Sequence, residues 1–169
     1  MPFNSLLDEA LEAWAYTRAG VIAEIKNLSD RELTFKPHPE SRTPAEIALH
    51  LAQTGMMMAG ELTRPDGDFT RKAFPQFVKE HAGSLRATTK KSEIVQMLKR
   101  THADGERRIR AAGELQMLQH IKRFDGVPGS RLAWMNHGIS HEEYHRGQLA
   151  LYARLVGRVP ALTKLIYGE

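Results

Sequence analysis

The sequence contains no cysteine among its 169 residues. This absence excludes a disulfide framework, a zinc site built from thiolates and a cysteine nucleophile. It fits a reducing cytosol, so we expect a cytoplasmic protein. No stretch approaches the roughly 18 consecutive apolar residues that a transmembrane helix needs. The opening residues, MPFNSLLDEALEAW, have no basic leader and turn acidic at Asp8, which is unlike a signal peptide.

An excess of one charge is also missing, because 24 Lys and Arg residues stand against 20 Asp and Glu residues. Two basic pairs, Lys99-Arg100 and Arg107-Arg108, have Asp104 between them. Such mixing is typical of solvated helix faces, and it makes a nucleic-acid binder the less favoured interpretation.

Helical periodicity is the main pattern that the sequence does contain. Apolar residues recur at three- and four-residue steps, which predicts long helices over residues 5–26, 44–62, 90–112 and 130–156. The second helix has the clearest start, because Thr43 can cap it, Pro44 takes its first position and Glu46 completes a capping box. Four long amphipathic helices predict an all-α four-helix bundle.

The length suits one domain over residues 1–169, since no linker-like stretch divides it. The middle connection, residues 69–88, is long enough to cross over the bundle, and we expect one helical turn around Phe77 within it. We expect a loop over residues 113–129 and a tail over residues 158–169 that a few apolar residues pin to the bundle.

The eight histidines are unevenly placed. Four are expected at the surface: His38, His81, His102 and His120. On the fourth helix, His137, His141 and His145 are spaced four residues apart, and two such side chains can chelate one ion from neighbouring turns. Three consecutive turns of a straight helix cannot all converge, so the third ligand must come from elsewhere. His50 is the best choice, because it lies on the apolar stripe of the second helix.

Two other interpretations of these histidines stay open. His50 alone is more simply a core histidine with a hydrogen-bonding partner, although a shared metal would satisfy several buried imidazoles at once. Residues 141–145 also match H-E-x-x-H, the zinc-protease motif in which the glutamate is the general base. No histidine follows His145 to supply the third ligand of a protease, so we expect Glu142 and Glu143 to face solvent or to support the ligands.

Two segments carry a resemblance to a known family: TPAEIALHL at residues 43–51 and WMNHGISHEEYHRGQL at residues 134–149. The second contains the pattern H-x-x-x-H-R-G-Q. With the order and length of the helices, these segments make the chain similar to the DinB/YfiT-like superfamily of metal-dependent four-helix proteins.

The resemblance implies an up-down-down-up bundle that is often a homodimer, with one divalent metal ion held by His50, His141 and His145. Zinc and nickel are the ions that we expect, with a small-molecule substrate. Related members include thiol-dependent S-transferases and a maleylpyruvate isomerase, so the resemblance also suggests an external low-molecular-weight thiol.

Three histidine ligands leave a fourth position open, as in catalytic zinc sites. The hypothesis is therefore a metalloenzyme that activates water or a small thiol, hydrolase-like or S-transferase-like. A non-catalytic metal-binding or sensor bundle is the alternative. No second carboxylate cluster is evident, which disfavours a di-iron site. His137, Tyr144 and Gln148 could orient ligands by hydrogen bonds or serve helix packing.

Overall fold

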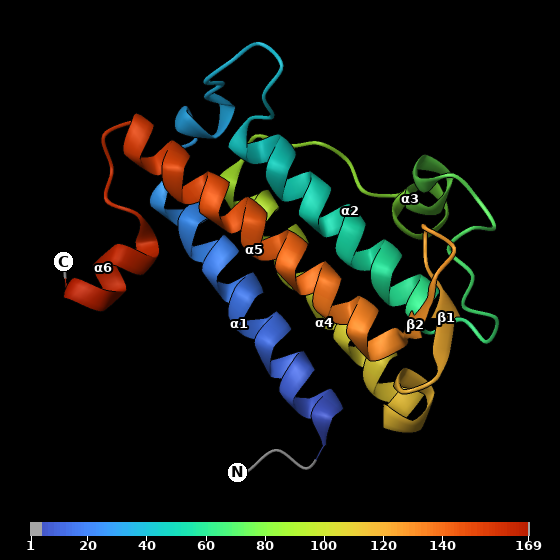
Figure 1. Cartoon of the computed structure of the whole chain (residues 1–169). Coiled ribbons are helices and arrows are strands. Elements are labelled where there is room, and N and C mark those ends of the chain that lie inside the picture. The colour runs from blue at the N-terminus through green and yellow to red at the C-terminus, as the bar shows by residue number, and fades with distance from the viewer. Residues whose placement is uncertain (1–4, 169) are drawn as a thin grey trace.

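Four long helices form the bundle in the computed structural model, which describes residues 5–168. Figure 1 shows α1 running away from the N-terminus, α2 and α4 running back in a common direction, and α5 returning beside α1. This is the all-α, up-down-down-up four-helix bundle that was predicted. The long helices are α1 (Leu6–Asn27), α2 (Pro44–Leu62), α4 (Lys91–Met117) and α5 (Arg131–Leu155).

Shorter elements occupy the connections between the long helices and the tail after α5. A two-stranded antiparallel hairpin precedes α5, with Ile121 opposite Gly129. None of the helices that the structure describes is both long and apolar enough to cross a bilayer. The shorter elements are η1 (Glu32–Thr34), α3 (Phe74–Ala82), β1 (His120–Lys122), β2 (Pro128–Ser130) and α6 (Ala161–Tyr167).

Local side-chain chemistry explains where the long helices begin. The capping box of α2 is present, since the Glu46 amide donates to Thr43 Oγ1 at 3.2 Å and the Thr43 amide donates to Glu46 Oε2 at 2.8 Å. Ser5 and Ser130 cap α1 and α5. Each serine hydroxyl accepts a hydrogen bond from the backbone amide three residues later in the chain. The backbone of α4 breaks at Gly113, whose φ of 77° favours glycine, and one further turn leads to Met117.

The expectation of a loop over residues 113–129 was wrong in part, and the tail over residues 158–169 contains a helix that the sequence did not predict. The hairpin strands are too short to produce a sequence pattern, and tertiary hydrogen bonds hold them. The Phe69 amide donates to the Lys122 carbonyl at 2.8 Å, and the Lys122 amide donates to the Gly67 carbonyl at 3.0 Å. The tail forms α6 because Glu24 of α1 accepts from the Ala161 amide at 2.9 Å. Neither interaction is local in sequence.

Two clusters of buried apolar side chains fill the bundle, and a buried ion pair between Arg18 and Glu142 lies where they meet. Arg18 also donates to the backbone carbonyls of Leu51 and Leu98 in one cluster, while Trp14 of the other donates to Glu142. This polar layer holds α1, α2, α4 and α5 together. It lies at the level of the predicted metal ligands, because Glu142 directly follows His141 on α5.

Candidate metal centre

His50 of α2 meets His141 and His145 of α5 where the two helices pack together. The Nε2 atom of His141 lies 3.1 Å from that of His50 and 3.2 Å from that of His145. All three ligand atoms lie within 4.8 Å of one another. We call these residues the histidine trio. The sequence-predicted ligands are thus the three histidines that the structure brings together, and His137 is outside the group.

A hydrogen bond to Gln148 defines which nitrogen of His145 faces the group. Gln148 Oε1 lies 2.5 Å from His145 Nδ1, and a carbonyl oxygen can only accept. In neutral His145 the proton is therefore on Nδ1, and the lone pair of Nε2 is directed at the other two rings. A bond of this kind to the remote nitrogen is typical of metal-binding histidines.

Burial keeps the three imidazoles neutral. It lowers the pKa of His50 to about 4, with a further contribution from the positive charge of Arg42. Burial also lowers the pKa of His141 and the pKa of His145. The neighbouring His145 lowers the pKa of His141 further. Neutral imidazole is the form that binds metal, so protons compete weakly for these nitrogens at neutral pH.

The donor set fits a metal ion better than it fits a closed hydrogen-bond network. The lone pair of His145 Nε2 faces inward, so His141 must donate its Nε2 proton to that lone pair. His141 Nε2 then has no lone pair left to accept a hydrogen bond from His50. One contact is therefore unpaired in the protein alone. Metal–nitrogen bonds of about 2.0–2.1 Å in a tetrahedron separate nitrogens by about 3.3 Å, close to the two separations that involve His141.

Glu142 is committed to the polar layer and is not free to act as a base. It is only 3% exposed, so the expectation that it faces solvent was wrong. Its Oε1 accepts from Arg18 Nε, and its Oε2 accepts from Arg18 Nη2 at 2.9 Å and from Trp14 Nε1 at 3.0 Å. The protease interpretation of H-E-x-x-H consequently lacks its general base. Glu143 is partly exposed and accepts from Thr17 and Arg146.

A family model described as the DinB superfamily matches residues 13–149, most of the chain. The chain belongs to the DinB superfamily. Among solved structures, it is similar to YfiT from Bacillus subtilis, described as a probable metal-dependent hydrolase with an unusual four-helix bundle topology. The TM-score is 0.70 at 15% identity, and the match covers 94% of each chain.

Two further structures share the fold of this DinB superfamily member. The DinB-like protein YjoA from Bacillus subtilis has a TM-score of 0.68 at 16% identity, and a DinB-like protein from Bacillus cereus has 0.67 at 18%. Each match covers 89% of this chain and 93% of the other. Identities this low establish the shared fold alone. No curated protein matches the chain.

The histidines outside the trio have varied surroundings in this DinB superfamily member. His38 and His120 are exposed, as expected, but His81 and His102 are half-buried. His102 packs against Trp14 with ring centroids 4.5 Å apart. His137 stacks on Trp134 at 4.7 Å, one turn before His141. The sequence missed the burial of His81 and His102 because it depends on helices that are distant along the chain.

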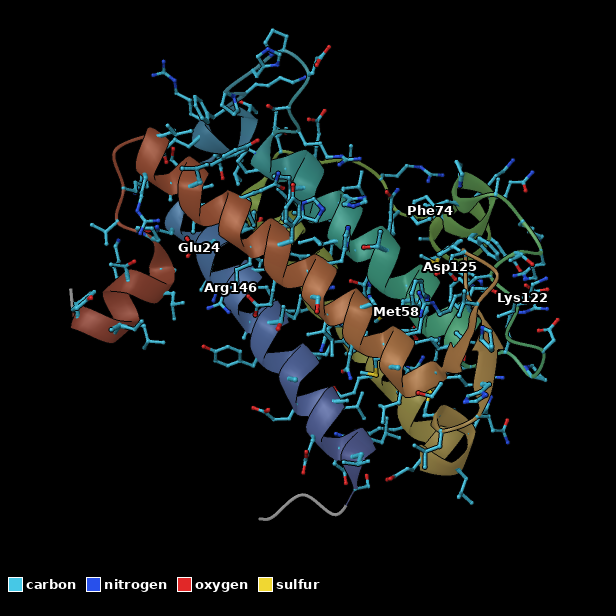
Figure 2. The ribbon with its side chains drawn as sticks, in the orientation of Figure 1. Glu24, Met58, Phe74, Lys122, Asp125 and Arg146 are labelled. Carbon is cyan, nitrogen blue, oxygen red and sulfur yellow. The ribbon has the colours of Figure 1, made fainter. Side chains whose placement is uncertain are left out.

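A pocket of about 240 Å³ begins at His141 and extends toward the hairpin end of the bundle. Figure 2 shows Met58 and Phe74 at that end, near Lys122 and Asp125 of the hairpin. Most of the lining is apolar or aromatic, and we call this cavity the aromatic pocket. Its walls are Thr54, Gly55, Met57, Met58, Phe69, Phe74, Phe124, Trp134, His137, Gly138, His141 and Glu142.

Sequence reasoning missed the aromatic pocket. Phe69 and Phe124 lie in segments without helical periodicity, and no spacing rule relates them to Trp134 on α5. The available signal was weak: three of the six phenylalanines, Phe69, Phe74 and Phe77, fall within the middle connection, residues 69–88.

A second group of ligand-type residues lies where α3 packs against the end of α2. Glu61, Glu80 and His81 also place one ligand atom each within 4.8 Å, and we call them the Glu61 cluster. Arg71 donates to Glu61 and to Glu80, and Lys72 donates to Glu80 at 2.8 Å. The sequence expectation of no second carboxylate cluster was wrong, although cations of the protein already pair with these carboxylates.

Proposed function

We propose that this DinB superfamily member is a metalloenzyme in which the histidine trio holds one divalent ion, zinc or nickel, beside a substrate pocket. The observation that carries the proposal is the convergence of three neutral Nε2 atoms from α2 and α5. The description of YfiT as a probable metal-dependent hydrolase supports it by analogy.

The residues of the chain have separate tasks in this proposal. His50, His141 and His145 hold the ion, and Gln148 keeps the His145 ring turned toward it. The ion pair between Arg18 and Glu142 anchors the turn of α5 that carries His141. An ion with three protein ligands supplies Lewis acidity in its open position, where the pKa of a water or a small thiol falls toward neutrality. A thiol would be external, because the chain has no cysteine.

A metal-binding protein without turnover is the second candidate. The aromatic pocket favours an enzyme over this candidate, because His141 lines a cavity that can admit a small molecule. A site for storage or structure would instead be closed around the ion. Homodimer formation stays a prediction. Light scattering tests it by measuring the molar mass of the protein in solution.

The first experiment measures metal by plasma mass spectrometry in tag-free protein after incubation with zinc or nickel and removal of free ion. We expect about one equivalent in wild type. His50→Ala and His145→Ala should lose it. His38→Ala and His120→Ala are matched controls, because each removes an exposed histidine outside the trio. A wild-type protein without metal, or equal loss in the controls, would contradict the proposal.

Turnover is tested on the loaded protein with two reactions. One is the transfer of 2-mercaptoethanol to an aromatic chloride, and the other is the hydrolysis of an aromatic ester. We expect one of these activities in wild type and in His38→Ala but not in His50→Ala. Full metal occupancy with neither activity, over a panel of such substrates, would favour the non-catalytic candidate.

A further inference from the structure

The aromatic pocket contains features of a binding site for one kind of chemical group. Its volume of about 240 Å³ exceeds the roughly 150 Å³ of a protein cavity that binds benzene. One end is His141 of the histidine trio, and the other is a set of aromatic rings that pack against one another at tilted angles. Phe124 lies in the turn of the hairpin, with its ring centroid 4.9 Å from Phe69 and 6.1 Å from Trp134.

The polar groups in the wall are already engaged by the protein. Thr54 Oγ1 donates to the His50 carbonyl at 3.0 Å, and Glu142 accepts from Arg18 and Trp14. The remaining polar side chains of the lining are His141, at the candidate metal centre, His137, whose imidazole is exposed, and Trp134, whose indole carries an N–H donor. A charged group inside the pocket would lose hydration without gaining a countercharge, because the one charged residue in the described lining, Glu142, is already paired with Arg18.

The two arginines that lie over aromatic rings at this end of the bundle are paired with carboxylates. The Arg123 guanidinium lies 5.1 Å from the centre of the Trp134 ring and pairs with Asp125 at 2.6 Å. Arg71, which lies over Phe77, is engaged by the Glu61 cluster. The surroundings therefore favour neither an anion nor a cation.

Rigid connections hold the walls in place. The buried Arg131 guanidinium donates to the carbonyls of Leu62 and Arg64 at 2.7 Å and of Pro65 at 3.1 Å. Arg131 is the first residue of α5, so these contacts join α5 to the end of α2 and the residues after it. The backbone bonds of Lys122 to residues 67 and 69 join the same loop to the hairpin. A cavity that is formed before the ligand arrives loses little free energy to ordering its walls.

We propose that the aromatic pocket binds a neutral, flat apolar ring of the substrate and places the substituent of that ring at His141. This inference rests on the proposed function for the reacting end, and it adds the substrate class: small aromatic or similarly flat electrophiles. The ring of the substrate packs against Phe74, Phe124 and Trp134, which form the aromatic wall, and its reactive group lies next to the histidine trio.

The test compares two metal-binding probes on zinc-loaded protein by isothermal titration calorimetry. Acetohydroxamate carries the metal-binding group alone, and benzohydroxamate adds a phenyl ring. We expect benzohydroxamate to bind more tightly by about tenfold or more, because the pocket removes the ring from water. In Phe124→Ala and Phe74→Ala this ratio should fall toward one, while the affinity for acetohydroxamate stays unchanged.

The matched control is Phe35→Ala, which removes a partly buried phenylalanine that packs on Tyr152, outside the aromatic pocket. It should keep the wild-type ratio. Equal affinities of wild type for the two hydroxamates would overturn the proposal. So would a ratio in Phe124→Ala and Phe74→Ala that matches wild type.

A second probe separates failure of the pocket from failure of the metal site. If the protein retains no zinc, the proposed function fails, and 4-fluorobenzyl alcohol is then titrated into the metal-free protein and observed by fluorine NMR. Saturable binding that is lost in Phe124→Ala and kept in Phe35→Ala would support the aromatic pocket by itself. No saturable binding would overturn it.

Discussion

The histidine trio and the Glu61 cluster both bring three potential ligand atoms within 4.8 Å, yet their surroundings differ in charge. Glu61 is fully buried and is bonded by Arg71 and His81, and Arg71 and Lys72 also bond Glu80. The contacts of the histidine trio are to one another and, through His145, to Gln148. Proximity of ligand-type residues is therefore a weak criterion for a metal site. The Glu61 cluster is a salt-bridge network because cations of the protein already neutralise its carboxylates, whereas no such partner among residues 5–168 occupies the nitrogens of the histidine trio.

Loss of a ligand from the histidine trio should have the largest effect. We expect His141→Ala to weaken zinc binding by more than about 100-fold, because a missing ligand costs more than a missing outer hydrogen bond. Competition with a chromophoric chelator measures the affinity. Glu61→Gln is the matched comparison and should bind zinc like wild type. Weaker binding in Glu61→Gln but not in His141→Ala would reverse the assignment of the two groups.

Loss of charge in the Glu61 cluster should lower stability instead. Glu61→Gln leaves Arg71 without its buried carboxylate, and we expect a loss of about 2–3 kcal/mol in the free energy of unfolding, since the ion-pair partners of Glu61 are all partly exposed. Urea denaturation of the metal-free protein measures it. Glu12→Gln, which changes an exposed glutamate of α1, should be neutral. A Glu61→Gln protein as stable as wild type would show that the ion pairs are unimportant.

The hydrogen bond from His145 to Gln148 should have an intermediate effect on the metal. Gln148→Met preserves the length of the side chain but removes the acceptor, and we expect about tenfold weaker zinc binding. Gln148→Glu restores an acceptor and should recover the affinity. The same chelator competition applies. Equal weakening in both variants would point to packing rather than to orientation of the imidazole.

The smallest expected effect is a difference in acid sensitivity. Hydrogen bonds from Lys72 and Arg71 lower the pKa of Glu80 from 4.5 to about 2. In this range the unfolded chain binds the proton more readily than the folded protein does. The stabilisation is therefore complete above about pH 4.5 and is lost as the pH falls toward 2.

Glu80→Gln should accordingly be less stable than wild type at pH 7 and should converge with it in strong acid. Urea midpoints at a series of pH values test this, with Glu12→Gln as the control. A constant difference between Glu80→Gln and wild type at every pH would mean that the charge of Glu80 does not contribute.

Much of the bundle was predictable because its signals are local. Thr43, Pro44 and Glu46 define the start of α2 through groups within one turn, and the spacing of His141 and His145 places both on one face of α5. The choice of His50 as the partner was an inference from its apolar stripe and from family resemblance. The structure places its Nε2 beside the other two.

The sequence by itself thus determined the four long helices, the capping box of α2 and the histidine pair on α5, because these depend on residues a few positions apart. Tertiary structure alone decided the rest. Phe69, Phe124 and Trp134 meet only after the hairpin is tied to the loop after α2, and Glu142 becomes buried only when α1 brings Arg18 to it. Their roles depend on distance in space, which hydrophobic periodicity along one segment does not encode.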